Sequence, residues 1–98
     1  MQVRFMTNAD IDFALSLTSS EGWTDIRSDF ELLITYSPQA AFIAVEGGER
    51  IGMISAVAYG KFGFIGSLIV LDTYRNRGIG TKLMKYAIEY LEKNKVTI

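Results

Sequence analysis

The chain has 98 residues, of which 49% are hydrophobic, and its formal net charge at pH 7 is −1. A chain of this length forms one small domain or part of one, and it buries only about 60–65% of the surface that its unfolded state exposes. The balanced charge argues against a nucleic-acid-binding protein, which usually has a strong basic excess. The lack of Cys and His excludes disulfides, thiol nucleophiles, imidazole bases and Cys/His zinc sites in these residues.

Nothing in the sequence indicates a membrane segment. The longest apolar run is far short of the ~20 residues that span a bilayer. The first residues, MQVRFMTNAD, have no apolar signal core. These features predict a cytoplasmic protein with no membrane partner, no nucleic-acid partner and no metal.

A strand and two helices are predicted in the first part of the chain. Residues Val3–Thr7 alternate weakly in polarity and predict a short strand, whose last residue caps a helix with Asp10, close to a capping box. This helix ends at Gly22, and a second one begins at Thr24–Asp25 and ends before Pro38. The apolar stripes are Ile11, Ala14, Leu15 and Leu17 in the first helix, and Ile26, Phe30, Leu33 and Ile34 in the second.

Three predicted strands follow as an antiparallel meander. They are the apolar runs Ala40–Glu46, Arg50–Gly60 and Phe64–Asp72. Gly47–Gly48 predicts a hairpin turn between the first two, and Lys61–Gly63 turns the chain into the third.

The clearest helix runs from Gly78 to about Asn94. Its apolar stripe consists of Leu83, Met84, Ala87, Ile88 and Leu91. Val96–Ile98 resembles the first residues of another strand. The order β-α-α-β-β-β-α-β predicts an α+β fold, in which helices flank a mixed, mainly antiparallel sheet.

The segment YRNRGIGTKL, residues 74–83, joins the third of these strands to this helix. A helix N-terminus presents backbone N–H groups and about half a positive charge, so it suits an anion such as phosphate. Gly78 and Gly80 leave the backbone open to such an approach. Arg75 and Arg77 have side chains that suit phosphate oxygens, and Thr81 adds a hydroxyl.

Other glycine motifs fit this segment poorly. A Walker A loop requires G-x-x-x-x-G-K-S/T, but Thr81 separates Gly80 from Lys82. The Rossmann fingerprint requires a small residue where this chain has Leu83, and it opens a parallel βαβ unit. A tight strand-to-helix turn with solvated arginines is the alternative that the motif leaves open. The position between an apolar strand and an amphipathic helix favours the phosphate site.

The stretch SLIVLDTYRNRGIGTKLMKYAIEYL resembles the acetyl-CoA-binding core of the GNAT superfamily of N-acetyltransferases. The core pattern of that family is R/Q-x-x-G-x-G/A, which residues Arg75 to Gly80 match. The order β-α-α-β-β-β-α matches the first two-thirds of the family fold, so the resemblance covers the whole chain. The stretches EGW (Glu21–Trp23) and AVAYG (Ala56–Gly60) also resemble a branch of longer bacterial and archaeal members.

The resemblance implies a binding mode for acetyl-CoA, the expected cosubstrate. The amides of Arg77 to Thr81 would hold the pyrophosphate, and the backbone of Leu68–Val70 would pair with the pantetheine arm and polarise the thioester carbonyl. An amine would attack acetyl-CoA directly, without a covalent enzyme intermediate. The implied cofactor-binding residues are Leu68, Ile69, Val70, Arg75, Asn76, Arg77, Gly78, Ile79, Gly80 and Thr81.

The sequence departs from the family pattern in three ways. Thr73 stands where many members have proline, and the strand Phe64–Asp72 has no carboxylate before its end to act as a base. The family also has a further helix, whose tyrosine often protonates the departing thiolate, and further strands. Tyr86 and Tyr90 lie on the wrong helix for that role. We therefore expect residues 1–98 to form a single, truncated acyl-CoA N-acyltransferase domain that lacks the usual C-terminal helix and strands, with unassigned catalytic residues.

Three residues are candidates for the acceptor side. Trp23, between the first two helices, is suited to line a pocket. Glu21, with Asp25 and Asp29, is suited to attract an amine or to act as a base through water. Tyr59 lies near a strand end and is suited to face the acceptor. The simpler alternatives are a packed tryptophan, solvated helix-end charges and a packed or edge tyrosine.

Two functions are compatible with these features. The first is an N-acetyltransferase that uses acetyl-CoA and a small-molecule or peptide amine. The second is a non-catalytic module that binds coenzyme A or assembles with itself. A homodimer is expected, because the strand after Phe64–Asp72 is reduced to Val96–Ile98 and leaves an apolar edge that another chain can pair with.

Overall fold

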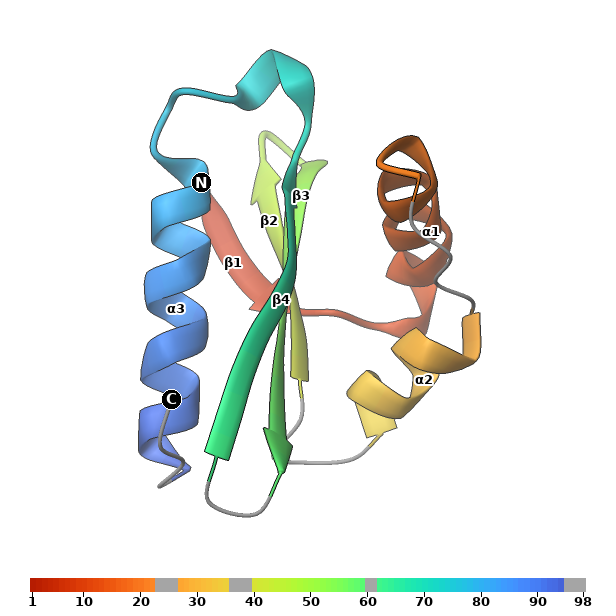
Figure 1. Cartoon of the computed structure of the whole chain (residues 1–98). Helices are drawn as coiled ribbons and strands as arrows, with labels where there is room; N and C mark the ends of the chain where they lie inside the picture. Colours follow the sequence, from red (N-terminus) through yellow and green to blue (C-terminus); the bar gives the residue numbers. More distant parts are fainter. Residues whose placement is uncertain (23–26, 36–39, 60–61, 95–98) are drawn as a thin grey trace.

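The computed structural model describes residues 1–22, 27–35, 40–59 and 62–94. They form a four-stranded antiparallel sheet in the order β1-β2-β3-β4, with three helices (Figure 1). The strands are β1 (Gln2–Phe5), β2 (Ala40–Glu46), β3 (Glu49–Tyr59) and β4 (Phe62–Val70). The helices are α1 (Ile11–Ser20), α2 (Arg27–Thr35) and α3 (Ile79–Lys93), and 3₁₀ turns lie at Asn8–Asp10 and Asp72–Tyr74. The predicted α+β class and the order β-α-α-β-β-β-α are confirmed.

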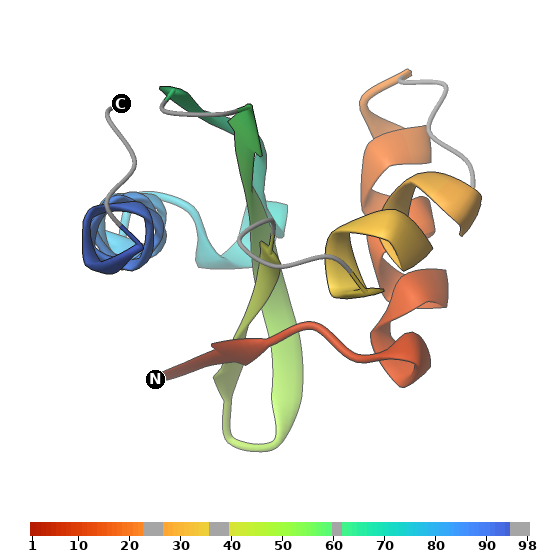
Figure 2. The same ribbon diagram turned by 90° about the horizontal axis from the view of Figure 1, so that it is seen from below.

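The sheet lies between α3 on one face and α1 with α2 on the other (Figures 1 and 2). Side chains of a strand alternate between the two faces. In β2, Phe42 and Ala44 therefore pack in the core under α3, whereas Ala41 and Ile43 pack in the core under α1 and α2. Helices thus lie on both faces of the sheet.

The strand boundaries agree with the prediction for β2 and shift slightly elsewhere. Gly47 and Gly48 form the β2–β3 hairpin turn with φ of +58° and +80°, a conformation that glycine adopts without steric cost. The strand β4 begins at Phe62, inside the predicted turn, because Phe62 already pairs with Tyr59. It ends at Val70 because a 3₁₀ turn follows, in which the Tyr74 N–H donates to Leu71 O at 2.8 Å.

The buried carboxylate of Asp10 joins β1, the start of α1 and β3. It accepts hydrogen bonds from the Thr7 N–H at 2.7 Å, from both terminal nitrogens of Arg4 at 2.7 and 2.9 Å, and from Arg50 Nε at 2.6 Å. Burial by itself would raise the pKa of Asp10, but these bonds outweigh it and hold the pKa well below its usual range. The bond to Thr7 also explains why β1 ends before this residue, contrary to the predicted Val3–Thr7.

Some predictions fall outside the described residues. They are the helix start at Thr24–Asp25, the helix end at Pro38 and the final strand Val96–Ile98. Among the helices that the structure describes, none combines the length and the apolar character that a bilayer crossing requires.

Candidate cofactor-binding site

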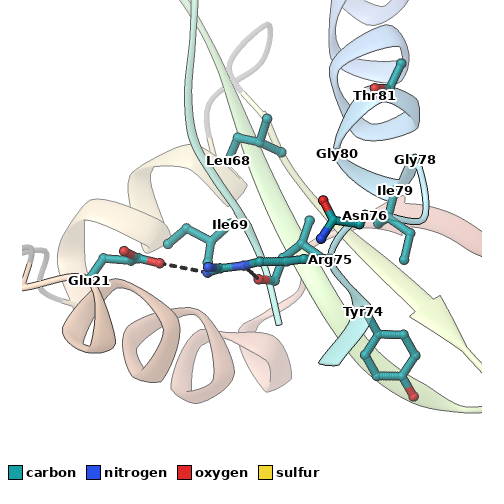
Figure 3. Close-up of a pocket in the computed structure, with 11 residues that line it drawn as sticks. Glu21, Leu68, Ile69, Tyr74, Arg75, Asn76, Gly78, Ile79, Gly80 and Thr81 are labelled. Carbon is teal, nitrogen blue, oxygen red and sulfur yellow. Dashed lines mark hydrogen bonds and ion pairs between the residues drawn. The ribbon is translucent and has the colours of Figure 1, made fainter. Parts of the chain in front are cut away.

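A pocket of about 560 Å³ opens where the C-terminal end of β4 approaches the N-terminal end of α3 (Figure 3). It is lined by Glu21, Leu68, Ile69, Val70, Tyr74, Arg75, Asn76, Gly78, Ile79, Gly80 and Thr81. The structure therefore brings together all the predicted cofactor-binding residues except Arg77. It also adds the predicted acceptor residue Glu21.

The turn before α3 is shaped by two residues in the left-handed region, Asn76 at φ +66° and Gly78 at φ +77°. Asparagine and glycine adopt this conformation more readily than other residues. The first intrahelical bond runs from the Lys82 N–H to Gly78 O at 3.1 Å. The preceding amides, those of residues 79–81, therefore have no intrahelical acceptor, and the helix dipole adds positive potential where they lie. This arrangement suits an anion.

Gly80 has no structural reason to be a glycine. Its φ is not in the left-handed region, and a Cβ added there would meet only Leu68 Cδ2, at 4.0 Å. A helical glycine costs about 0.5–1 kcal/mol relative to alanine. The open space in front of Gly80 favours a ligand that approaches the backbone closely, as a pyrophosphate does.

The guanidinium of Arg75 contacts other groups of the protein (Figure 3). Its Nε donates to Val70 O at 2.9 Å, its Nη2 donates to Glu21 Oε1 at 3.0 Å, and its Nη1 lies 2.9 Å from Asp72 Oδ1. The predicted contribution of Arg75 to phosphate binding therefore competes with three existing contacts.

Arg77 does not line the pocket, and its side chain contacts the loop and the β2–β3 hairpin. Its Nη1 is 3.7 Å from Glu46 Oε2, and its guanidinium stacks 5.0 Å above the Tyr74 ring. The Tyr74 hydroxyl donates to Glu49 Oε2 at 3.1 Å, and this bond raises the pKa of Tyr74. Arg77 thus attaches the loop to the hairpin, and only its backbone belongs to the turn before α3.

A β-bulge interrupts β4 beside the pocket. Gly66 pairs with Ser55 and Ile69 with Met53, so two residues of β4, Ser67 and Leu68, face one residue of β3. Ser67 has φ of +51°. A bulge bends the strand and redirects its backbone groups. Sequence reasoning missed this bulge, although a glycine within an apolar run, here Gly66, is a signal for one.

The strand β4 is the edge strand next to the pocket. Its only neighbour among the described residues is β3. An edge strand can pair with an extended ligand through its outward-facing backbone groups. The residues Leu68–Val70 begin within the bulge and lie at this edge, where the Val70 carbonyl already accepts a hydrogen bond from Arg75 Nε.

The predicted acceptor residues have different outcomes. Glu21 lines the pocket. Tyr59 pairs with Phe62 at the opposite end of β4, six residues before Leu68 and so roughly 20 Å from the pocket at ~3.3 Å per residue, and the structure does not bring it to the site. Trp23 lies outside the described residues. No three His, Cys, Asp or Glu side chains within the described part of the chain are grouped so that they could hold a metal ion.

Comparison with known proteins agrees with this fold. The model of the acetyltransferase (GNAT) family matches residues 9–98. An uncharacterized N-acetyltransferase of Archaeoglobus fulgidus is 34% identical over 79 residues, and the match covers 72% of this chain and 54% of that protein. The chain thus spans about half the length of the curated relative.

Two solved structures share the fold. A Mycobacterium tuberculosis protein in complex with CoA and NLQ has a TM-score of 0.85 at 13% identity, over 98% of this chain and 60% of that one. An aminoglycoside N-acetyltransferase in complex with CoA has a TM-score of 0.79 at 19% identity, over 97% of this chain and 73% of that one. The match of the family model over nearly the whole length, together with this fold, shows that the chain belongs to the acetyltransferase (GNAT) family.

Proposed function

We propose that residues 1–98 form a single domain that is the cofactor-binding part of an acetyl-CoA-dependent N-acetyltransferase. The observation that carries this proposal is the turn before α3, where the amides of Ile79, Gly80 and Thr81 have no intrahelical acceptor and line a pocket. Family membership supports acetyl transfer, and the two relatives solved with CoA support the cosubstrate.

In this proposal the two walls of the pocket hold different parts of acetyl-CoA. The amides of Arg77–Thr81 bind the pyrophosphate, and the pantetheine arm runs along Leu68–Val70. The backbone after the bulge at Ser67 supplies the amide that polarises the thioester carbonyl as its oxygen gains negative charge.

The proposed reaction is a direct displacement. The amine nitrogen attacks the thioester carbon, a C–N bond forms, and the C–S bond breaks. The amine loses a proton, and the departing thiolate of coenzyme A gains one. No cysteine occurs among the 98 residues, which fits a reaction without a thioester-linked enzyme intermediate. The described residues contribute binding and carbonyl polarisation.

The proposed acceptor is a primary amine on a small molecule or a peptide. The Glu21 carboxylate lines the pocket and is suited to attract a cationic amine. The likeness to an aminoglycoside N-acetyltransferase supports a small-molecule amine.

The proposal is tested by thermal-shift measurements with acetyl-CoA, coenzyme A and ATP. Release of free thiol from acetyl-CoA in the presence of a panel of amines tests the transfer step. Greater stabilisation by acetyl-CoA and coenzyme A than by ATP is expected, because ATP offers the phosphates without the pantetheine arm. Equal stabilisation by ATP, or none by coenzyme A, would contradict the proposed site.

A second candidate function is a non-catalytic module that binds coenzyme A or assembles with itself. It is favoured by the lack of a carboxylate in β4, Phe62–Val70, where a base could lie beside the thioester. Stabilisation by coenzyme A without thiol release under any amine would support this function. We also propose that the chain forms a homodimer through β4, whose Phe62 and Phe64 side chains are exposed.

A further inference from the structure

We infer that Arg75 is a positioning residue that fixes Glu21 beside the C-terminal end of β4, and that its guanidinium is not a phosphate ligand. The inference rests on the proposed function for the identity of the pocket's ligands. The contacts that carry it belong to the protein without any ligand.

The three partners of Arg75 come from three different elements. Val70 O is the last carbonyl of β4, Glu21 follows α1, and Asp72 begins the 3₁₀ turn. A guanidinium is a planar fork with five N–H donors, so it can hold these partners in fixed directions. A lysine ammonium is a single point of charge on a flexible stem and cannot reproduce this arrangement.

The positive charge of Arg75 is already more than neutralised by its protein partners. The carboxylates of Glu21 and Asp72 both lie within 3.0 Å of its terminal nitrogens. A phosphate at this guanidinium would therefore meet a local net charge of about −1, whereas no carboxylate in the described part of the chain contacts the amides of residues 79–81. Electrostatics directs the pyrophosphate to the turn before α3 and leaves Arg75 with its protein partners.

Hydrogen bonds of both its backbone and its side chain fix the position of Glu21. Its N–H donates to Leu17 O at 3.3 Å and to Thr18 O at 3.2 Å, which closes the C-terminal end of α1. Its side chain is held by Arg75 through Oε1. Among the described residues, Oε2 has no hydrogen-bond partner. One carboxylate oxygen is thus anchored, and the other remains for a cationic amine beside β4.

Ligand binding distinguishes the two roles of Arg75. NMR titration with ADP, which has a pyrophosphate but no pantetheine, and with coenzyme A gives two Kd values for each variant. The variants are Arg75→Gln, Arg75→Lys and, as a matched control away from the pocket, Arg27→Gln, which removes the arginine of an exposed ion pair with Asp12. If Arg75 were a phosphate ligand, loss of its charge-assisted contact would raise the Kd of both ADP and coenzyme A by about tenfold or more.

For a positioning residue, the Kd of ADP stays within about twofold in all three variants, because the amide site is intact. The Kd of coenzyme A rises about threefold or more in Arg75→Gln and Arg75→Lys, because the end of β4 is no longer held, and it does not rise in Arg27→Gln. Equal weakening of ADP and coenzyme A in Arg75→Gln, with recovery in Arg75→Lys, would overturn the inference. An unchanged Kd for coenzyme A in both Arg75 variants would also overturn it.

A second measurement needs no ligand. A double-mutant cycle of Arg75→Gln and Glu21→Gln, followed by Tm, reports the coupling of the two side chains. The decrease in Tm of the double variant should be smaller than the sum of the decreases in the two single variants by about 2 °C or more. Additive losses would contradict the link between Arg75 and Glu21. A wild-type chain that fails to bind coenzyme A but shows coupling would refute the proposed function alone.

Discussion

Gly80 lies beside Leu68 with room for a methyl group, since a Cβ added at Gly80 would make ordinary van der Waals contact with Leu68 Cδ2 at 4.0 Å and meet nothing closer. A side chain at this position is therefore compatible with the fold but would occupy the proposed pyrophosphate site. We expect Gly80→Glu to abolish stabilisation by acetyl-CoA, because it adds bulk and negative charge beside the amides of Ile79 and Thr81. Thermal shift with acetyl-CoA measures the effect.

The matched control is Gly80→Ala. It should raise the stability of the free protein by about 0.4–1 kcal/mol, because alanine has less conformational freedom in the unfolded chain. Full stabilisation of Gly80→Glu by acetyl-CoA would place the cosubstrate elsewhere on the molecule.

We expect Asp10 to contribute strongly to the change of stability with pH. Its pKa in the folded protein lies below the value of about 3.9 in the unfolded chain. The contribution of its carboxylate is therefore fully present above the unfolded pKa and is lost as the pH falls through the folded pKa. We expect stability to fall between about pH 5 and pH 2, with Tm measured by circular dichroism.

Replacing Asp10 should remove part of this pH dependence. Asp10→Asn is expected to cost about 3 kcal/mol at pH 7, because it leaves two arginines without their charged partner. Arg50→Gln removes one partner and gives a smaller loss in the same direction. The control Asp12→Asn, at an exposed ion pair with Arg27, should change stability by less than about 0.5 kcal/mol. An unchanged Tm for Asp10→Asn at neutral pH would refute this role of Asp10.

Much of the fold follows from local patterns. The strand β2 has the predicted bounds because its side chains are buried on both faces and Gly47–Gly48 ends it with a turn. Of the predicted stripe of α3, Leu83, Ala87 and Leu91 are fully buried against the sheet, whereas Met84 and Ile88 are half-buried and line a groove. The position of the pocket follows as well, because a glycine-rich turn after a strand places a helix N-terminus at the sheet edge.

The directions of the side chains could not be predicted in the same way. Glu21 and Arg75 are 54 positions apart, and only the packing of α1 beside the end of β4 brings them together. Sequence reasoning likewise gave Arg75 and Arg77 the same expected role. In the structure Arg75 lines the pocket, whereas the Arg77 side chain contacts the β2–β3 hairpin. The partners of a polar side chain depend on its neighbours in the tertiary structure, and the periodicity of the sequence carries no information about those neighbours.

The isolated 98-residue chain should transfer acetyl groups slowly or not at all. It spans only 54% of the curated relative, and no described side chain is assigned to proton transfer. Thiol release from acetyl-CoA with a panel of small amines measures the rate. A turnover above about 1 s⁻¹, the lower end of common enzyme rates, would show that these residues suffice for catalysis.

The last prediction concerns self-association through β4. This strand is at the edge of the described sheet, and its Phe62 and Phe64 side chains are 65% and 58% exposed. Beside it, a groove of about 720 Å³ between Leu68 and α3 is lined by the apolar side chains of Met84 and Ile88. An apolar edge strand is a template for another chain, and a two-fold arrangement is the commonest way for two copies to cover it.

Light scattering at micromolar concentration decides between a dimer and a monomer. We expect about twice the monomer mass of 10.9 kDa. The double variant Phe62→Lys/Phe64→Lys should shift the mass toward the monomer, because like charges along an edge strand oppose pairing. The matched control Tyr86→Lys lies on α3, away from β4, and should leave the mass unchanged. A wild-type mass near 11 kDa with a cooperative melt would exclude the dimer and show that this edge is tolerated in a single chain.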